Sequence, residues 1–403
     1  MISLKQKRTL ARMAVFLCVW TALLFAGYSV SEPDKSRMRF EADFNLLWEE
    51  LTDSYPYLPY LREQGTDTDS IYERYSAELA SADHEAGFAG MLQRMFSELG
   101  NFAHLSLVTP ELYRNYHYIY AAGSDPAAEP PSGKFNSMLR DPRLWAGYKA
   151  PECPETERDV ATQSRYPKTA VHYYDDCKAL YLQLPSFAQE IVDRDRSVVG
   201  DALKKYPEAE HIIFDITGNS GGSDYYWMEN LVAPFGGRYE FNYRNFFRES
   251  DIYHEYYSDL EAQVVSGLED APAWAELMGL DRYYESTLVL PEEGSVPSSR
   301  IGNIRRWVLI GSRVYSASEK FASFCKATGW AMLVGRRTSG DGLGATPVLI
   351  LLPDSGLLVR FSYFAGENPD GSLNAAAGTQ PDVICVKNTL PLTRCLELIR
   401  QGF

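Results

Sequence analysis

The sequence is poor in the residues that bind metals and that crosslink small secreted folds. Its 403 residues include six cysteines and six histidines, and no two cysteines form a C-x-x-C pair. That absence excludes the common zinc and thioredoxin-like motifs. Five of the histidines also lack a carboxylate or a cysteine at ligand spacing: His84, His117, His172, His211 and His254. We therefore predict neither a metal nor an organic cofactor.

Positive charge is scarce as well. Lys and Arg total 39 against 54 Asp and Glu, which leaves a net charge of −15. Binding to nucleic acid or to anionic lipid needs clustered Lys and Arg, so we exclude nucleic acid as a partner and a lipid surface as a partner of the folded part. The 45% share of apolar residues is ordinary for a globular protein, and the length predicts two or three domains.

The N-terminus carries one apolar run, from Met13 to Tyr28, and acidic residues follow it. The basic residues before the run are Lys5, Lys7, Arg8 and Arg12. This charge bias predicts a cytoplasmic N-terminus and an extracytoplasmic remainder. We assign residues 1–35 to a signal peptide or a signal anchor. Without an A-x-A cleavage site, and with the bulky Trp20 and Tyr28, a retained single-pass anchor is favoured, and a cleaved signal would make the protein secreted.

Cys153, Cys177, Cys325, Cys385 and Cys395 follow the apolar run. In an oxidising compartment a Cys153–Cys177 or a Cys385–Cys395 bridge could form, although spacing alone establishes neither. We expect most of these thiols to be unpaired and buried.

Three regions follow the N-terminal segment. Apolar residues at helical spacing predict helices around 44–51, 70–81 and 88–99, with Gly100 as a C-terminal cap, so we assign 36–118 to a small helical domain. Residues 119–165 are rich in Ala, Pro, Gly and Ser, which indicates an exposed linker or insertion. Residues 166–403 alternate short apolar strands with helices, which is typical of an α/β core. The expected strands are 179–184, 211–216, 307–310, 331–334 and a hairpin at 348–361.

The strongest local feature is Val314-Tyr-Ser-Ala-Ser-Glu, directly after the expected strand 307–310. A serine at a strand-to-helix junction is exposed, and the next N–H, that of Ala317, can point at a bound carbonyl oxygen. Acyl transfer needs this combination of a nucleophile and backbone donors. Alternatively, Ser316 only caps the helix, with Glu319 completing a capping box. The segment by itself leaves both interpretations open.

The second feature is Phe214-Asp-Ile-Thr-Gly-Asn-Ser-Gly-Gly, after another expected strand. Gly221 and Gly222 have no side chain, so their backbone can approach a ligand closely and supply a second oxyanion donor. The turn lacks the G-x-G-x-x-G spacing of a dinucleotide site.

Four blocks resemble one family, in its order along the chain. The turn at Asp215 resembles a "D-x-R-x-N-x-G-G" motif. Ser316-Ala-Ser-Glu with Val334-Gly-Arg-Arg-Thr-Ser-Gly-Asp-Gly resembles an "S-A-x-E … V-G-x-x-T-x-G-x-G" block. Gly378-Thr-Gln-Pro-Asp resembles a closing "G-x-x-P-D", and Leu99-Gly-Asn-Phe-Ala-His-Leu resembles "L-x-D-x-H-x-x-L". The family is that of the C-terminal (tail-specific) processing peptidases and the related tricorn-like serine peptidases.

The resemblance, which covers about 85–110 and 175–385, implies a crotonase-like (ClpP-like) αβ peptidase core in 166–403. It also implies hydrolysis of a peptide or protein substrate by Ser316, with oxyanion donors at Ala317 and at Gly221 or Gly222. It favours the nucleophile over the capping interpretation.

The base differs from both branches of that family. Tail-specific peptidases have Lys where this chain has Asp341, so a Ser–Lys dyad is excluded. Tricorn-like enzymes use a His that His104 matches, but they also use a Glu where Ala375 stands. We expect His104 to be the base. Asp370 or Glu367 could orient its imidazole, and Asp341 could accept a hydrogen bond from His104 or Ser316.

Two further alternatives remain open. The aromatic residues of 239–257 could line a groove or form a lid, although a β-hairpin packed on the core is the preferred interpretation. The missing Lys and Glu also allow a non-catalytic protein on the same fold that binds peptides or an apolar ligand.

Overall fold

The computed structural model describes residues 32–121, 133–148, 165–257, 264–266, 270–290, 294, 296 and 303–403. The apolar run expected to be a signal segment lies outside these residues, as does Cys153. Among the described residues, no helix combines the length and the apolar character that a membrane crossing would need. The four cysteines that the structure describes are all free thiols: Cys177, Cys325, Cys385 and Cys395.

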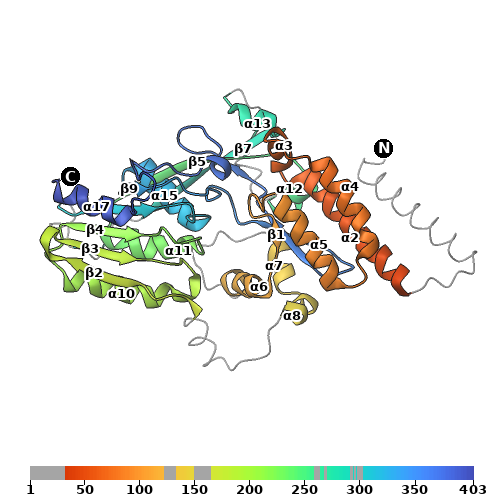
Figure 1. The fold of residues 1–403 in the computed structure, drawn as a ribbon, viewed down its shortest axis with the longest axis horizontal. Coiled ribbons are helices and arrows are strands. Elements are labelled where there is room, and N and C mark those ends of the chain that lie inside the picture. Colours follow the sequence, from red (N-terminus) through yellow and green to blue (C-terminus); the bar gives the residue numbers. More distant parts are fainter. Residues whose placement is uncertain are drawn as a thin grey trace, which may run out of the picture.

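A six-stranded sheet forms one end of the molecule (Figure 1). In spatial order its strands are β13 (Val383–Ile384), β9 (Met332–Gly335), β8 (Arg305–Ile310), β4 (His211–Asp215), β3 (Ala179–Gln183) and β2 (Ala170–Tyr174). All neighbours are parallel except β2, which pairs antiparallel with β3. The expected α/β core is therefore confirmed, and its strands lie where the apolar runs predict them.

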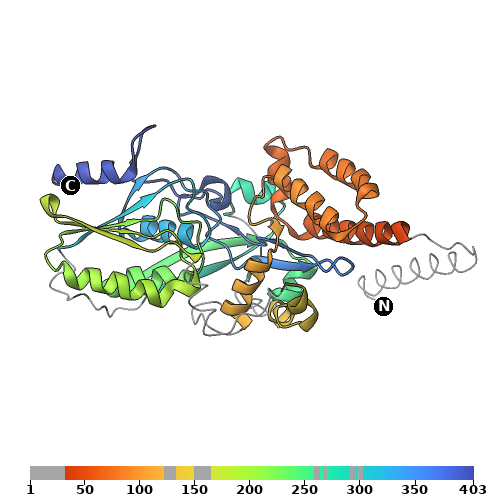
Figure 2. The same cartoon turned by 60° about the horizontal axis from the view of Figure 1, so that its bottom comes forward.

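Alternating side chains bury both faces of this sheet. Ile212 and Phe214 of β4 belong to one hydrophobic cluster, whereas Ile213 between them belongs to another. The first cluster also contains residues of α10 (Val192–Lys205) and α15 (Ala317–Thr328), and the second contains residues of α17 (Pro391–Arg400). Figure 2 shows α10 and α17 on opposite sides of the sheet. This arrangement is the expected consequence of strands that are apolar on both faces.

Four N-terminal helices gather at the other end of the molecule (Figure 1). They are α2 (Glu32–Ser54), α3 (Tyr57–Glu63), α4 (Thr68–Glu78) and α5 (Glu85–Glu98), with a 3-10 turn at Leu79–Ser81. The helices predicted around 44–51, 70–81 and 88–99 coincide with α2, α4 with its 3-10 turn, and α5. Gly100 adopts a φ of 75° directly after α5, which suits a residue that ends a helix.

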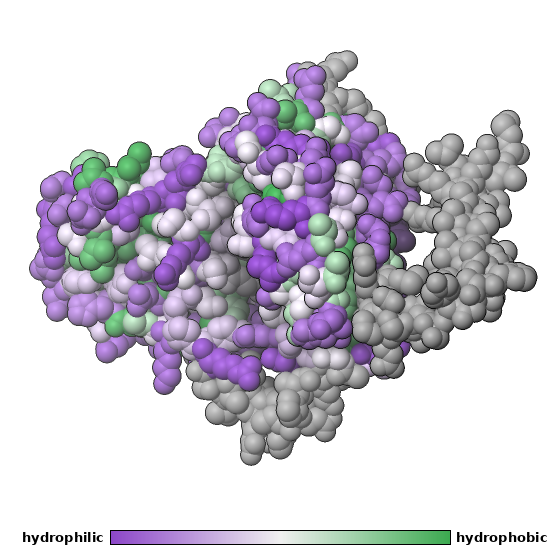
Figure 3. Space-filling model, turned by 45° about the vertical axis from the view of Figure 1, so that its right-hand side comes forward, coloured by the Kyte–Doolittle hydropathy of each residue, from purple (hydrophilic) through white to green (hydrophobic). Residues whose placement is uncertain are grey.

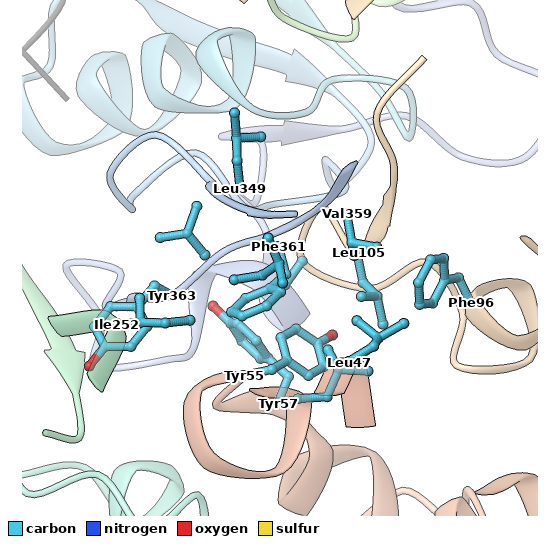
Figure 4. Close-up of a cluster of buried hydrophobic side chains, with 14 of the residues drawn as sticks. Leu47, Tyr55, Tyr57, Phe96, Leu105, Ile252, Leu349, Val359, Phe361 and Tyr363 are labelled. Carbon is cyan, nitrogen blue, oxygen red and sulfur yellow. The ribbon is translucent and has the colours of Figure 1, made fainter. Parts of the chain in front are cut away.

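The N-terminal helices share a core with a small antiparallel sheet of β1 (Ser106–Leu107), β11 (Leu358–Phe361) and β10 (Val348–Leu351). Figure 4 shows Tyr55 and Tyr57 from the helical end facing Phe361 of β11. The rings of Tyr55 and Phe361 meet edge to face, with centroids 5.4 Å apart. A segment from the end of the chain therefore completes the core of the helical region.

The described part of the expected linker at 119–165 is folded. The helix α6 (Pro110–Tyr116) continues into a π-helical turn at His117–Ala121, and α7 (Gly133–Leu139) and α8 (Pro142–Tyr148) follow. Phe135, Leu139 and Tyr148 are buried, and the ring of Tyr148 stacks on that of Tyr113. This result differs from the expectation because a few apolar residues at helical spacing outweigh the Ala, Pro and Gly around them.

The aromatic segment forms a third sheet. Its order is β12 (Ala365–Gly366), β5 (Tyr239–Phe247), β7 (Arg282–Leu290) and β6 (Val264–Ser266). The strands β5 and β7 pair antiparallel along their whole length, from Tyr239 opposite Leu290 to Phe247 opposite Arg282. Phe241, Phe246 and Phe247 are buried, so this segment packs on the core as preferred. The expected hairpin is wrong, however, because 239–257 supplies one strand and one helix, and its partner strand is 282–290. Tyr243 of the segment lines the cavity described below. The remaining helices and helical turns are α11 (Asp224–Trp227), α12 (Asp251–Tyr256), α13 (Ala273–Leu277), α16 (Asn374–Ala377), Asp175–Cys177, Gln189–Ile191, Met228–Val232 and Ala233–Phe235.

The outer surface is largely hydrophilic on the face that Figure 3 draws. Hydrophobic residues form scattered patches on this face.

Candidate active site

Two loops of the candidate site begin side by side at one edge of the large sheet. Asp215 at the end of β4 pairs with Leu309 near the end of β8, and the strands are parallel. The Gly-Gly turn therefore meets the segment that carries Ser316 at the carboxyl edge of the sheet, where open α/β sheets bind ligands. A Cβ atom on Gly221 would lie 2.7 Å from the Tyr315 carbonyl oxygen and 2.9 Å from the Ser316 Cβ. Glycine is thus required for the turn to pack against the serine.

The backbone of Ser316 is strained. It precedes α15 with φ 56° and ψ −129°, and its side chain makes no cap hydrogen bond. A non-glycine residue in such a sparsely populated region costs about 1–3 kcal/mol, a cost that is met mostly at functional sites. Glu319 is fully buried, and its Oε1 accepts hydrogen bonds from Asn374 and Thr379 instead of serving a cap. The capping-box interpretation is therefore wrong.

The small sheet brings His104 to the serine from a distant part of the chain. β1 pairs with β11 so that Ser106 lies opposite Arg360, and the N–H of Ser362 donates to the carbonyl of Ala103 at 2.8 Å. The backbone N–H of His104 donates to the hydroxyl of Tyr315 at 3.0 Å. His104 is thereby fixed beside the residue that precedes Ser316.

A buried carboxylate holds one nitrogen of the His104 ring. Nδ1 of His104 lies 2.5 Å from Oδ2 of Asp341, and only 8% and 5% of the two side chains are exposed. The Ser362 hydroxyl lies 3.0 Å from the same Nδ1 and donates to Asp341 at 3.2 Å. Because Nδ1 is engaged by these oxygens, the neutral ring keeps its proton there and leaves Nε2 as the proton acceptor.

Tyr315 contacts both His104 and Asp341. Its hydroxyl donates to Oδ2 of Asp341 at 2.7 Å while it accepts the His104 N–H. Burial, and then the Asp341 carboxylate, hold the pKa of Tyr315 well above its usual value. The phenol therefore stays protonated and remains a donor to the carboxylate.

Backbone strain is concentrated at these residues. His104, Ser316 and Asp341 have φ angles of 61°, 56° and 58°, and they are three of seven non-glycine residues with positive φ among the described residues. Asp and His tolerate this region better than most residues, but Ser adopts it less often. Three strained residues in one site indicate that the surrounding structure enforces their geometry.

Two backbone donors beside Ser316 are unused. Within the described part of the chain, neither the N–H of Ala317, at the start of α15, nor that of Gly222 donates a hydrogen bond. The N–H of Gly221 is occupied, because it donates to Oδ1 of Asn219 at 2.9 Å. The positive end of the α15 dipole adds to the field at Ala317. Of the two glycines predicted as donors, only Gly222 keeps a free N–H.

These groups line one cavity of about 620 Å³. The predicted residues that it brings together are Ser316, His104, Ala317, Gly221, Gly222 and Asp341. The Ser316 hydroxyl makes no hydrogen bond within the described residues, and the pair His104–Asp341 shares its cavity. A catalytic serine–histidine hydrogen bond often forms only when substrate binds.

The other two carboxylates considered for orienting His104 lie elsewhere. Asp370 accepts hydrogen bonds from the backbone N–H and hydroxyl of Ser372, and both oxygens of Glu367 hold Arg244. Neither residue lines the cavity. Ala375, which stands where tricorn-like enzymes have Glu, is buried in α16. Asp341 is the carboxylate that contacts the imidazole.

Sequence reasoning missed three residues of the site: Tyr315, Ser362 and Arg360. Tyr315 lies within the segment that drew attention to Ser316, but nothing in that segment indicates that its hydroxyl reaches a residue 211 positions away. Arg360 belongs to the expected hairpin and Ser362 directly follows it, and the pairing of this strand with 106–107 leaves no local signal. No group of three or more potential metal ligands occurs among the described residues.

Comparisons with known proteins agree with this architecture. A family model described as peptidase family S41 matches residues 178–385, and a model described as the tricorn protease C1 domain matches residues 37–97. No curated protein matches the chain.

Solved structures show the same fold at low identity. A crystal structure from Parabacteroides merdae gives a TM-score of 0.51 at 15% identity, covering 89% of this chain and 96% of that one. Mature CPAF gives a TM-score of 0.54 at 12% identity, covering 91% and 96%. Since the first family model spans just over half of the 403 residues, the chain belongs to peptidase family S41, a family of serine peptidases.

Proposed function

We propose that this protein hydrolyses peptide bonds through an acyl-enzyme on Ser316, with His104 as the base and Asp341 as the group that orients it. The observation that carries the proposal is the buried His104–Asp341 pair, whose Nδ1–Oδ2 distance is 2.5 Å, in the same cavity as a strained serine. This arrangement supplies a nucleophile, a base and an orienting acid from three distant segments. The same roles define serine hydrolases on unrelated folds.

The reaction has two halves. Ser316 Oγ attacks the carbonyl carbon of the peptide bond while His104 Nε2 accepts the hydroxyl proton. The N–H groups of Ala317 and Gly222 stabilise the oxygen that becomes negative. His104 then returns its proton to the leaving amine as the carbon–nitrogen bond breaks. In the second half, water attacks the ester, His104 takes a proton from the water, and Ser316 Oγ leaves with that proton.

Because Asp341 stands where a tail-specific peptidase has Lys, the base proposed for this site is His104 and not a lysine. A carboxylate cannot replace Lys as a cation, but it can fix the tautomer of a histidine and stabilise the imidazolium that forms. The non-catalytic alternative was motivated by the missing Lys and Glu. It loses that motivation because Asp341 already supplies an acid beside His104.

The direct test compares the full-length protein with its Ser316→Ala variant on a pool of unstructured peptides, with products read by mass spectrometry. We expect cleavage by the wild type and a loss of at least about a thousandfold in the variant. Ser197→Ala is the matched control, because Ser197 is exposed on α10. Equal turnover by Ser316→Ala, with both proteins folded, would refute the mechanism.

We also propose that the catalytic part works outside the cytoplasm, held by an N-terminal signal anchor. The support is the basic cluster Lys5–Arg12 followed by the apolar run Met13–Tyr28. In intact cells, a C-terminal epitope should be digested by externally added protease. Protection of the epitope, with digestion only after lysis, would place the domain in the cytoplasm.

A further inference from the structure

One cation in the active-site cavity has only neutral hydrogen-bond partners. Arg360 lies on β11 and lines the cavity with Ser316 and His104. Its Nε donates to the hydroxyl of Ser106 at 3.0 Å, and its Nη1 donates to the hydroxyl of Tyr116 at 2.9 Å. Both hydrogen-bond partners are uncharged, and they fix the direction of the guanidinium. The buried Asp341 carboxylate also attracts Arg360, but from beyond the 4.0 Å of an ion pair.

Two other cations, one outside the cavity and one inside it, are already paired with carboxylates. Both oxygens of Glu367 hold the Arg244 guanidinium, and Asp224 lies 2.9 Å from the ammonium of Lys320, the second cation of the cavity. Among the described residues, no carboxylate oxygen lies within 4.0 Å of an Arg360 nitrogen, and Nη2 donates no hydrogen bond. This free donor is notable in a chain whose net charge is −15.

The chemistry of a guanidinium identifies what would satisfy it. Arg stays protonated at any physiological pH, and its planar fork matches the two oxygens of a carboxylate. Holding such a charge half-buried, with no carboxylate in contact with it, is unfavourable. The hydrogen bonds to Ser106 and Tyr116 hold the fork in place beforehand, which lowers the entropy lost when a ligand binds.

We propose that Arg360 binds a carboxylate of the substrate, either the free C-terminal carboxylate of a peptide or the side chain of an Asp or Glu close to the bond that is cut. The assignment deepens the proposed function, because it names the class of peptide that the Ser316 cavity prefers. Arg360 favours only a substrate carboxylate that lies next to it. Glu111 and Glu190 also line the cavity, so a carboxylate placed near them would be repelled.

The test measures binding and cleavage separately. Binding uses the full-length Ser316→Ala variant and fluorescent alanine-rich peptides in two matched pairs. One pair differs only by a free carboxylate or a carboxamide at the C-terminus, and the other only by an internal Asp or Asn in an amidated peptide. If the contact is charge-assisted, the affinity of at least one acidic peptide should exceed that of its neutral twin by about tenfold or more. The pair that shows the preference identifies the source of the carboxylate.

Three further variants in the Ser316→Ala background connect that preference with Arg360. Arg360→Gln should abolish the preference while it keeps a polar group for Ser106 and Tyr116. Arg360→Lys should keep part of it, since the charge remains but the fork is lost. Lys320→Gln removes a cavity cation that is already paired, so its acidic-to-neutral ratio should equal that of the parent.

The outcomes separate this proposal from the proposed function. Equal or absent binding of both twins in both pairs overturns the role of Arg360, as does a preference that survives Arg360→Gln. If acidic peptides bind through Arg360 but wild-type protein cleaves none of them, hydrolysis fails and the carboxylate site stands. If wild type cleaves acidic and neutral twins equally and binds them equally, hydrolysis stands and the carboxylate site fails.

Discussion

The candidate active site has two halves that depend on different parts of the fold. Ser316, Ala317 and the Gly-Gly turn follow neighbouring parallel strands of the large sheet, so short-range chain geometry places them. His104 reaches the site through the pairing of β1 with β11, and that sheet packs on the N-terminal helices. The nucleophile half could therefore form with the α/β core alone, whereas the base half requires the helical region to be docked.

This difference predicts how mutations in each half of the site impair catalysis. The halves are joined by the contacts of His104 with the Tyr315 hydroxyl and the Asp341 carboxylate, and Tyr315 also donates to Asp341. A change on the serine side should remove the nucleophile or its oxyanion donors. A change on the histidine side should leave a serine that is present but not activated.

The largest expected effect comes from removing the base. His104→Asn should lower kcat/KM by about a thousandfold or more, because His104 is the proposed acceptor of the Ser316 proton and an amide cannot take its place. Asn is chosen because it tolerates the positive φ of this residue better than Ala does. Steady-state kinetics check the loss, and thermal unfolding should show an intact fold. Retention of more than a tenth of the activity would exclude His104 as the base.

Asp341→Asn should have the next largest effect. The amide keeps the size of the side chain but loses the charge that fixes the imidazole tautomer, which predicts a loss of about a hundredfold or more in kcat. The pH–rate profile should change with it, because the acidic partner of His104 is gone. Asp370→Asn is the control, since within the described part of the chain the side chain of Asp370 accepts hydrogen bonds from Ser372 alone. Equal kinetics of the two variants would contradict the assignment of Asp341.

Adding a single methyl group to the glycine turn should damage the nucleophile half specifically. The Cβ of Gly221→Ala would lie 2.7 Å from the Tyr315 carbonyl oxygen at a φ of +103°, so the turn must move away from Ser316. We expect a stability loss of about 1–3 kcal/mol and a larger loss of activity. Gly218→Ala is the control because nothing lies within 4 Å of its Cβ position. Similar denaturation midpoints and rates for both variants would show that close packing at Gly221 is unimportant.

Tyr315→Phe tests the connection between the halves. Loss of the hydroxyl leaves the His104 N–H without its acceptor and Asp341 with one donor fewer. We expect kcat to fall about tenfold, with KM nearly unchanged and a shifted pH–rate profile, because Tyr315 acts by positioning. A change in KM alone would instead assign Tyr315 to substrate binding.

The smallest expected effect concerns the pH dependence of stability. Burial raises the pKa of Glu319 from 4.5 to about 7. The folded state therefore holds this proton more tightly than the unfolded state does, so its contribution is complete below pH 4.5 and is lost as the pH rises towards about 7. Urea unfolding of Glu319→Gln from pH 4.5 to 8 should show a smaller decline than wild type. An unchanged slope would mean that Glu319 does not titrate in this range.

The sequence was informative where neighbouring residues decide the structure. The segment at Ser316 and the turn at Gly221 and Gly222 could be located because strand, turn and helix signals lie next to each other. Asp341 drew attention because it stands where a related branch has Lys. The helices of the N-terminal region followed from their apolar periodicity.

What depends on distant contacts could not be derived in this way. The choice of Gly222 over Gly221 as donor depends on a hydrogen bond from Gly221 to Asn219, and the choice of Asp341 over Asp370 depends on how distant segments pack. Arg360 entered the site only through the pairing of β11 with β1.

The most direct test of the site is covalent labelling with a fluorophosphonate, which reports an activated serine without a peptide substrate. Ser316 Oγ should attack the phosphorus, fluoride should leave, and peptide mapping should find the adduct on Ser316. We expect labelling of the full-length protein to slow by at least about a hundredfold in His104→Asn and in Asp341→Asn. An adduct on another serine, or labelling of Ser316 at the same rate in all three proteins, would contradict the account.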